Sequence, residues 1–364
     1  MKNNEFTSPN VLPWWRWIFK RFDHLPGVTL YFLSRQNSTS PRFFSLYNES
    51  QHTRIVLVKG SRFLPKTDKL FLYFVKIFGR LCSVKFSKYA WASLTDYKSC
   101  LMLRTNCIIH IDDPEFTLVE ISRVQAVLRS KEKIGRRLLV IVTNDRNKDY
   151  FERYLNGCRV KVIPQGFTNL EPLSNSRVKF PEFTVVYSSP YIDYFGDKHE
   201  SHPAWGAVHL IDILIPQIRK ELPKVRVCLI GRIGKNAQQQ LEKFHNVHCM
   251  GLLTQLQTAE TLRKCHLGIY PRKVDNFRNV QKPYEYLGAG IPTITYELRD
   301  TEVVKDLGIG ISVASDSEFI DSIRLLSENP REYRRIVENI QRNQSQFSWR
   351  NLALELDQEY FREF

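Results

Sequence analysis

The chain has 364 residues, of which 43% are apolar, and it carries a formal net charge of +15 at pH 7. This apolar fraction excludes a largely disordered chain, and the length predicts two domains that each bury a core. The charge lies in the first half, because residues 1–180 hold 30 Lys and Arg against 14 Asp and Glu, whereas residues 181–364 hold 23 against 24.

A basic first half predicts an anionic partner, and two segments there mix aromatic side chains with cations. Residues 14–22 hold Trp14, Trp15 and Trp17 among Arg and Lys. Residues 66–80 have the i, i+3/i+4 spacing of an amphipathic helix with a basic face. Both patterns suit an anionic membrane surface, where indoles and cations lie at headgroup level. The alternative is that both aromatic faces pack on the sheet of the first domain.

Nucleic acid is a less favoured partner, because the sequence has no zinc-finger spacing, no RNA-recognition aromatic motif and no long basic tail. The 7 cysteines are scattered and include no Cys-x-x-Cys. This pattern argues against a disulfide framework or a zinc site and predicts a cytoplasmic location. We expect neither a secretory signal nor a spanning helix, since no apolar run reaches the ~18–20 residues that a membrane crossing needs.

The first domain alternates apolar strand-like runs with helix-like segments, which predicts a parallel sheet of Rossmann type. The predicted strands are Val28–Leu33, Arg54–Val58, Cys107–Ile111, Leu138–Val142 and Val160–Ile163. The predicted helices are Lys66–Arg80, Leu118–Arg129 and Lys148–Tyr154.

Polar residues lie at the end of one of these strands, in the run His110-Ile111-Asp112-Asp113-Pro114. Side chains at the carboxyl edge of a parallel sheet face the ligand crevice, so His110 and Asp112 are candidate catalytic residues. The alternative is an aspartate helix cap before a proline turn. The adjacent aspartates lack the Asp-x-Asp spacing of a metal site, so no metal ligand is predicted.

We predict an N-terminal domain over residues 1–170, a linker over 171–182 and a second domain over 183–346. Residues 347–364 are predicted as a final helix that crosses back to the first domain. In the second domain we predict strands at Thr184–Ser188, Val225–Ile230, Asn246–Met250, Leu267–Tyr270 and Thr293–Tyr296, with helices at Ala204–Leu222 and Thr258–Lys264. This rhythm indicates a second doubly wound sheet.

Two turns of the second domain are candidate parts of a nucleotide site. Gly231-Arg232-Ile233-Gly234-Lys235 is predicted as a turn rich in glycine and cations, although a lone Gly-x-x-Gly is also common in surface turns. Further along, Asp300 or Thr301 is predicted to cap a helix whose first amides can meet a phosphate. Ser315-x-x-Glu318 has the pattern of a capping box, and a further helix is expected to start at Asn329-Pro330.

The most informative stretch runs from Asn279 to Pro292 as Asn-Val-Gln-Lys-Pro-Tyr-Glu-Tyr-Leu-Gly-Ala-Gly-Ile-Pro. Pro283 favours the first turn of a helix, and Gly290 favours its end in a left-handed conformation. The N-terminal amides of this helix, with Lys282, form a site suited to a diphosphate. Glu285, one turn further in, can accept hydrogen bonds from two ribose hydroxyls.

These residues resemble the donor-site signature of GT-B glycosyltransferases, in particular glycosyltransferase family 4, and the similarity extends from about Phe183 to the C-terminus. The resemblance implies the fold class, α/β with two Rossmann-like domains facing a cleft. It implies that Lys282 meets the diphosphate of a nucleotide sugar and Glu285 its ribose, with Asn279, Tyr284, Gly231, Arg232 and Thr301 around the donor. Two departures are the absence of a second Glu, whose position is Phe277, and of an Arg and Lys after the first strand of this domain, where Lys198 and His202 are the remaining candidates.

The function that follows is transfer of a sugar from a nucleotide-diphosphate donor to a glycan or lipid-linked acceptor, with retention and without a metal or other cofactor. Its setting would be cell-surface polysaccharide or glycoconjugate synthesis. His110 and Asp112 would orient the transferred sugar, or deprotonate the acceptor in an inverting reaction. A nucleotide-sugar epimerase of the same fold, and a non-catalytic glycan- or nucleic-acid-binding protein, are the alternatives.

Overall fold

The structure is a computed structural model that describes residues 28–34, 53–59, 87–93, 97–102, 106–111, 117–167, 178–194, 205–274 and 280–363. The chain divides into two compact units, one of residues 1–163 with 353–364 and the other of residues 164–352. Each unit contains a six-stranded sheet. In the ranges just given, no helix is both long enough and apolar enough to cross a membrane.

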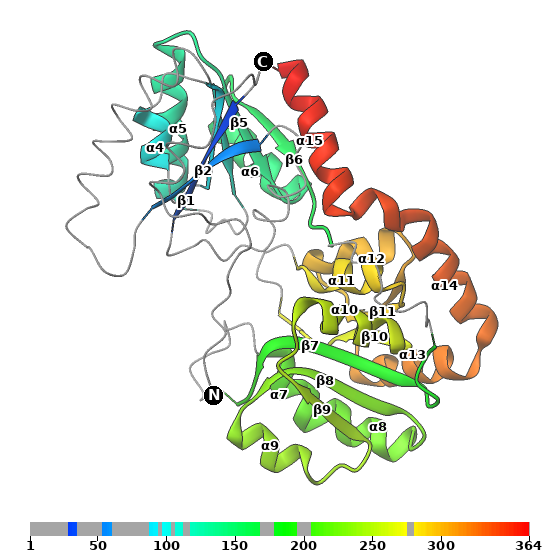
Figure 1. Cartoon of the computed structure of the whole chain (residues 1–364). Coiled ribbons are helices and arrows are strands. Elements are labelled where there is room, and N and C mark those ends of the chain that lie inside the picture. The colour runs from blue at the N-terminus through cyan, green and yellow to red at the C-terminus, as the bar shows by residue number, and fades with distance from the viewer. Residues whose placement is uncertain are drawn as a thin grey trace. The chain divides into compact units, whose positions relative to one another are not determined.

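The sheet of the first unit is parallel and has the strand order β2-β1-β3-β4-β5-β6. Figure 1 labels β1, β2, β5 and β6 of this sheet. Its strands are β1 (Val28–Ser34), β2 (Thr53–Lys59), β3 (Ser87–Ser93), β4 (Asn106–His110), β5 (Leu138–Val142) and β6 (Arg159–Val162). Its helices are α4 (Tyr97–Met102), α5 (Leu118–Glu132), α6 (Asp145–Tyr154) and the part of α15 (Trp349–Glu363) from Ala353 onward. An ion pair of 3.1 Å between Lys161 and Glu355 joins β6 to α15.

The five predicted strands of this unit are all present, within one residue of their predicted ends. Strand β3 was missed because its aromatic residues alternate with alanine and serine, which give little strand preference.

The capping residues set the true helix starts. Thr117 forms a capping box with Glu120 at α5, and the side chain of Asn144 accepts a hydrogen bond from Asn147 N–H, so α6 begins three residues before the prediction. The predicted helix Lys66–Arg80 and the segment Trp14–Phe22 lie outside the described residues.

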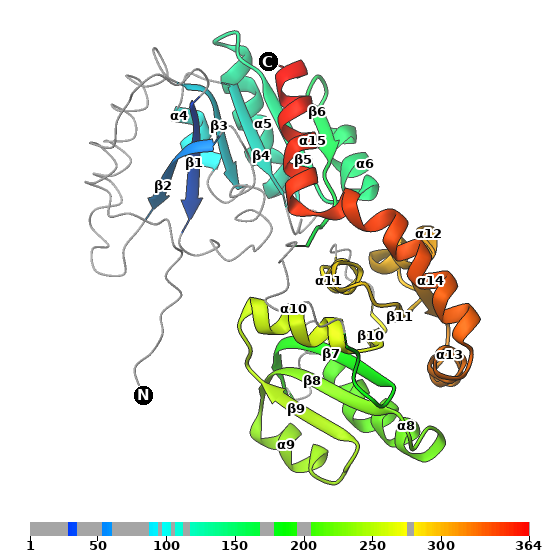
Figure 2. The ribbon, with the colours of Figure 1, turned by 45° about the vertical axis from the view of Figure 1, so that its right-hand side comes forward.

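The second unit has a parallel sheet with the order β12-β11-β10-β7-β8-β9. Figure 2 labels β7 to β11 of this sheet. Its strands are β7 (Thr184–Ile192), β8 (Arg226–Ile233), β9 (Val247–Gly251), β10 (Leu267–Tyr270), β11 (Thr293–Tyr296) and β12 (Gly310–Val313). Its helices are α7 (Trp205–His209), α8 (Ile215–Glu221), α9 (Lys235–Leu241), α10 (Gln255–Lys264), α11 (Lys282–Ala289), α12 (Glu302–Asp306), α13 (Asp316–Glu328) and α14 (Pro330–Asn343). The fold class is therefore confirmed as α/β with parallel sheets.

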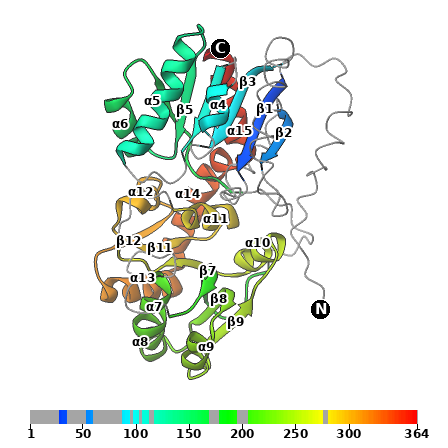
Figure 3. The same ribbon diagram turned by 90° about the vertical axis from the view of Figure 1, so that its left-hand side faces the viewer.

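Helices cover both faces of the second sheet. Figure 3 shows α10 and α11 on one face of the sheet that holds β7, β8 and β9, and α7, α8 and α9 on the other. The long helix predicted from Ala204 to Leu222 is present as α7 and α8, joined by a π-helical turn at Leu210–Leu214. Pro216 in the first turn of α8 explains the irregular turn, because proline cannot donate the helical hydrogen bond.

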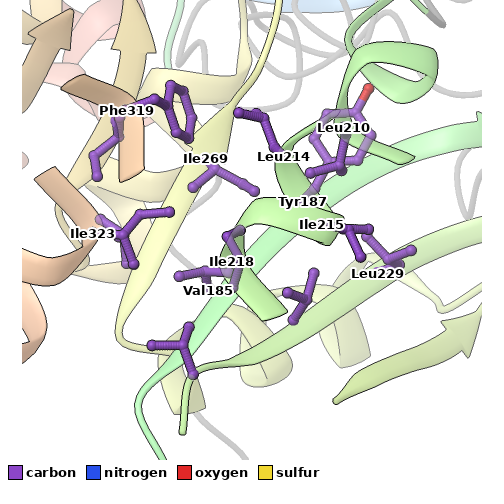
Figure 4. Close-up of a cluster of buried hydrophobic side chains, with 14 of the residues drawn as sticks. Val185, Tyr187, Leu210, Leu214, Ile215, Ile218, Leu229, Ile269, Phe319 and Ile323 are labelled. Atoms are coloured by element: carbon purple, nitrogen blue, oxygen red, sulfur yellow. The ribbon is translucent and has the colours of Figure 1, made fainter. Parts of the chain in front are cut away.

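The largest core of this unit lies between the sheet and α8 and α13. Its residues come from the central strands β7 and β10 and from both helices, among other elements. Figure 4 labels Val185, Tyr187, Leu214, Ile218, Ile269, Phe319 and Ile323 among them. The seven side chains are nearly or fully buried. A rigid sheet results, whose carboxyl edge can hold side chains at fixed positions.

Several local predictions for this unit need correction. Helix α9 and strand β12 were not predicted, since each is short and carries few apolar residues. At α13 the side chain of Ser315 accepts from Glu318 N–H, as predicted, but the Glu318 carboxylate accepts from Ala314 N–H and not from Ser315 N–H. Helix α14 begins at Pro330 as predicted, and the side chain of Asn329 caps it by accepting from the backbone N–H groups of Arg331 and Glu332.

Candidate functional site

The carboxyl edge of the second sheet positions the candidate site. From β7 the chain proceeds to β8 and β9 on one side, and from β10 it proceeds to β11 and β12 on the other. The strand order reverses between β7 and β10, and ligands of open α/β sheets bind outside the carboxyl ends of the strands at such a switch point. Helix α11 follows β10 and precedes β11, so its N-terminus lies at this same edge.

Helix α11 begins at Lys282 with Pro283 next, and it ends at Gly290 in the left-handed conformation with φ 74°. These bounds confirm the predicted helix and its cap. The glycine at position 288 permits close packing, because an ideal Cβ there would lie 2.4 Å from the ring of Phe167. Tyr286 fixes the other face: its hydroxyl donates to the carbonyl of Ile269 at 3.2 Å, and its ring fills the space left by Gly268.

Lys282 and Glu285 lie on one face of α11, with Nζ of the lysine 3.0 Å from Oε2 of the glutamate. Their side chains are 19% and 26% exposed. Both groups are therefore held near the surface at the N-terminus of a helix. That is a position where the helix dipole and the lysine charge favour an anionic ligand.

The structure places Tyr284 differently from the sequence prediction. Its side chain is 5% exposed, and its ring centroid lies 5.4 Å from that of Phe347. The residue belongs to the core because α11 turns this face toward the 3-10 turn Gln344–Phe347 that follows α14. We therefore leave its side chain out of the proposed donor site.

The predicted turn at Gly231–Lys235 is wrong, because β8 continues to Ile233. Gly231 lies inside the strand with φ 143°, where an ideal Cβ would be 1.8 Å from the carbonyl oxygen of Ser189. Gly234 then begins α9 against the carboxylate of Asp193, which accepts from Ala237 N–H at 3.0 Å. These glycines serve packing and capping. Arg232 is exposed between them and pairs in register with Tyr191.

Thr301 is 1% exposed, and its hydroxyl is within hydrogen-bonding distance of the carbonyls of Tyr296 (3.0 Å) and Leu298 (3.1 Å). It precedes α12 but makes no side-chain cap. The hydroxyl is thus used to close the turn after β11, and any contact of this residue with a ligand would have to come from its backbone.

In the first unit, His110 ends β4 as predicted and is 2% exposed. Asp112 and Asn279, the other two predicted site residues, lie outside the described residues, as does Phe277. The catalytic role of His110 stays a prediction.

A polar cluster at the carboxyl edge of the second sheet was missed by the sequence analysis. The carboxylate of Asp316 accepts from Lys273 at 2.7 Å, from His209 at 2.9 Å and from the hydroxyl of Tyr296. Burial alone would raise the pKa of Asp316, but these hydrogen bonds hold it below its usual value. Burial lowers the pKa of His209, against the opposing effect of Asp316. The four residues come from four separate segments, so no local spacing could reveal them.

No group of three His, Cys, Asp or Glu side chains placed to hold a metal ion occurs in the part of the chain that the structure describes. Independently of that finding, an anionic ligand at the N-terminus of α11 would meet the Lys282 side chain there. The arrangement suits the binding of a phosphate group next to a polyhydroxylated moiety.

Comparisons with known proteins agree with this arrangement. The family profile described as Glycosyl transferases group 1 matches residues 190–329, whereas no curated protein matches the chain in sequence. HepE of Anabaena, solved with UDP and glucose, shares 14% identity at a TM-score of 0.65, covering 93% of this chain and 100% of that one. A UDP-forming α,α-trehalose-phosphate synthase of Burkholderia xenovorans, solved with glucose-6-phosphate, shares 8% identity at a TM-score of 0.58, covering 92% and 99%. MnaA of S. aureus, solved with UDP, shares 8% identity at a TM-score of 0.54, covering 91% and 95%.

The similar structures show that the chain has the GT-B fold found in glycosyltransferases. Within that fold, residues 190–329 match the Glycosyl transferases group 1 profile, and this stretch contains α11 and its Lys282–Glu285 pair. The predicted class is confirmed. Membership of glycosyltransferase family 4 stays a prediction.

Proposed function

We propose that the chain transfers a sugar from a nucleotide-diphosphate donor to a glycan or lipid-linked acceptor, and that the second unit binds the donor. The observation that carries this proposal is the Lys282–Glu285 pair at the N-terminus of α11, on the carboxyl edge of a doubly wound sheet. Glu285 would accept hydrogen bonds from the two ribose hydroxyls. Lys282 would lie against the diphosphate.

The chemistry required of these groups is stabilisation of the leaving group. When the bond between the anomeric carbon and the phosphate oxygen breaks, negative charge grows on the diphosphate. A fixed cation stabilises this charge and so lowers the activation barrier of bond cleavage. We propose retention: the acceptor hydroxyl attacks from the face that the diphosphate leaves, and its proton passes to the departing phosphate oxygen. His110 and Asp112 would orient the transferred sugar. No step in this scheme is assigned to a metal.

Two of the similar structures support the choice of probes. HepE was solved with UDP and glucose, and the trehalose-phosphate synthase is UDP-forming and was solved with glucose-6-phosphate. We therefore take UDP-sugars as the first donors and sugars or sugar phosphates as the first acceptors to test on this chain.

The first half of the chain, with 30 Lys and Arg against 14 Asp and Glu, supports an anionic environment for the acceptor. We propose peripheral association with the anionic cytoplasmic face of a membrane, where each nearby cation contributes about 1 kcal/mol. The acceptor would then serve cell-surface polysaccharide or glycoconjugate synthesis. Cosedimentation with anionic and neutral vesicles at low and high salt tests this. Vesicle binding that does not depend on lipid charge or salt concentration would contradict the proposal, and so would a lack of vesicle binding. Either result would favour a soluble acceptor.

The decisive experiment for the activity has two stages. A thermal-shift panel of nucleoside diphosphates and their sugars should identify the donor, since a ligand at 100-fold its Kd adds about 2.7 kcal/mol of stability. Release of nucleoside diphosphate from that donor should then require acceptor, persist in EDTA and give a product of retained anomeric configuration by NMR. An epimerase would instead convert the donor without acceptor, and a non-catalytic protein would release nothing.

A further inference from the structure

Strand β9 ends the second sheet, where it pairs with β8. Figure 2 shows it as the outermost strand on that side of the sheet. His248, Cys249 and Met250 are exposed, and Leu252 just after the strand is 74% exposed. The strand at the opposite end of the sheet, β12, has no exposed residue. Because successive side chains of a strand point to opposite faces, both faces of β9 are open to solvent.

The backbone of β9 also presents hydrogen-bonding groups on its outer side. The N–H of Val227 on β8 donates to the carbonyl of Asn246 at 2.9 Å. The direction of the N–H and C=O groups alternates along a strand, so Asn246 and His248 direct theirs toward β8. Val247 and Cys249 direct theirs away from it. The register with β8 is regular over these residues and shifts only after Cys249, so the two outward residues are placed to pair with a further strand.

This edge lacks the charges that oppose strand pairing between chains. Residues 244–259 contain no Lys, Arg, Asp or Glu, although 25% of the chain is charged. Burial lowers the pKa of His248, so its ring is neutral at pH 7. The edge strand β6 of the first sheet, in contrast, carries Arg159 and Lys161, and cations on an edge strand oppose pairing with another chain. Strand β9 therefore has the exposure and the neutrality of a strand that is covered in an assembly.

We propose that two copies of this chain associate through β9, which pairs antiparallel with β9 of the second copy about a two-fold axis at His248. In this register Val247 of each copy pairs with Cys249 of the other, which forms four backbone hydrogen bonds. Charge selects a second copy as the occupant. Residues 1–180 hold 30 Lys and Arg against 14 Asp and Glu, so two copies repel through that half, whereas residues 181–364 hold 23 against 24. An uncharged edge in the near-neutral half is complementary to itself.

Sedimentation equilibrium of the full-length chain over a range of concentrations tests the association. We expect a dimer, twice the chain mass of 42.9 kDa. Cys249→Lys places a like charge from each copy beside the two-fold axis, so it should raise the dissociation constant of the dimer by at least about 10-fold. Leu325→Lys is the matched control, since it adds the same charge at an apolar position of α13 that is 42% exposed, and it should leave the dissociation constant unchanged.

A second variant tests the register and decides the question if C249K does not fold. Val247→Cys puts a thiol opposite Cys249 of the second copy at a Cα separation of about 5.5 Å, which suits a disulfide. Oxidised glutathione should link two V247C chains covalently, being itself reduced to two thiols, whereas Leu325→Cys should give no such dimer. A wild-type chain that stays monomeric at every concentration, a dimer that C249K leaves unchanged, or V247C chains that do not link would overturn the inference. None of these outcomes bears on the donor site.

Discussion

Nζ of Lys282 lies 3.0 Å from Oε2 of Glu285, so the two side chains assigned to the donor hold each other one turn apart on α11. Both are partly exposed, and an i, i+3 pair of this kind contributes only a few tenths of a kcal/mol to stability. Substitutions at either position should therefore leave the fold intact. Their effects on ligand binding can be interpreted as effects on the site.

Replacing Glu285 with alanine should weaken binding of the donor and of its nucleoside diphosphate. Two charge-assisted hydrogen bonds to ribose hydroxyls contribute roughly 2–4 kcal/mol, which corresponds to about 30- to 1000-fold in Kd. Isothermal titration measures the change. Glu338→Ala, at an exposed position on α14, is the matched control. Donor affinity that stays at the wild-type value in a folded E285A chain would remove Glu285 from the site.

Replacing Lys282 with alanine should slow turnover more than it weakens nucleoside binding, because the cation acts on charge that grows on the leaving diphosphate. We expect a loss of roughly 100-fold in kcat, about 3 kcal/mol, measured by release of nucleoside diphosphate. Lys305→Ala on the exposed side of α12 should leave kcat unchanged. An equal loss of affinity for free nucleoside and intact donor would mean that Lys282 does not contact the phosphates.

Gly231 should be required for folding and not for ligand contact. Alanine there would place Cβ 1.8 Å from a backbone oxygen at φ 143°, which we expect to cost more than about 3 kcal/mol. Gly135 also has a positive φ, 62°, but has no atom within 4 Å of an ideal Cβ, so Gly135→Ala should cost only about 1 kcal/mol. Urea denaturation compares the two. Similar midpoints for both variants would show that the strand can relax around Gly231.

Stability should fall as the pH is lowered from about 7 toward 4, and His266 should account for part of the loss. Burial, with a contribution from Lys179, lowers the pKa of His266 to about 4, and its Nδ1 accepts from Thr184 N–H. In the unfolded chain the pKa of His266 is near 6.5, so the unfolded state takes up the proton first as the pH falls. The stability that is present above pH 6.5 is therefore lost progressively as the pH falls from 6.5 toward 4. A fall in pKa from 6.5 to about 4 corresponds to about 3.4 kcal/mol, and solvent screening of this half-buried ring reduces the contribution to about 2–3 kcal/mol.

The measurement is the free energy of unfolding in urea at a series of pH values between 4 and 7.5. His266→Asn keeps an acceptor near the position of Nδ1 and cannot titrate, so it should flatten this part of the curve. A variant with the same slope as wild type would assign the acid sensitivity to other groups, such as His209 and His248, whose pKa values are also lowered by burial.

The sequence by itself determined the α/β class, most strands of both sheets and the helix of the donor signature. These features follow from local rules: apolar runs of strand length, Pro283 at a helix start and Gly290 at its end. Each rule acts over a few neighbouring residues, so it can be applied before any packing is known. The Lys282–Glu285 pair belongs here too, because a spacing of three residues places both side chains on one face.

Only the tertiary structure decided which polar residues at the carboxyl edge of the second sheet are available to a ligand. Tyr284 is three residues from the core position Leu287 and was assigned to the donor from the motif, yet its ring packs on Phe347, far along the chain. The hydroxyl of Thr301 is taken by backbone carbonyls, and Gly231 lies in a strand because β7 passes close to it. His209, Lys273, Tyr296 and Asp316 come together because their four segments end at one edge of the sheet. Contacts of this kind depend on strand order, and strand order is set by long-range packing that no local pattern records.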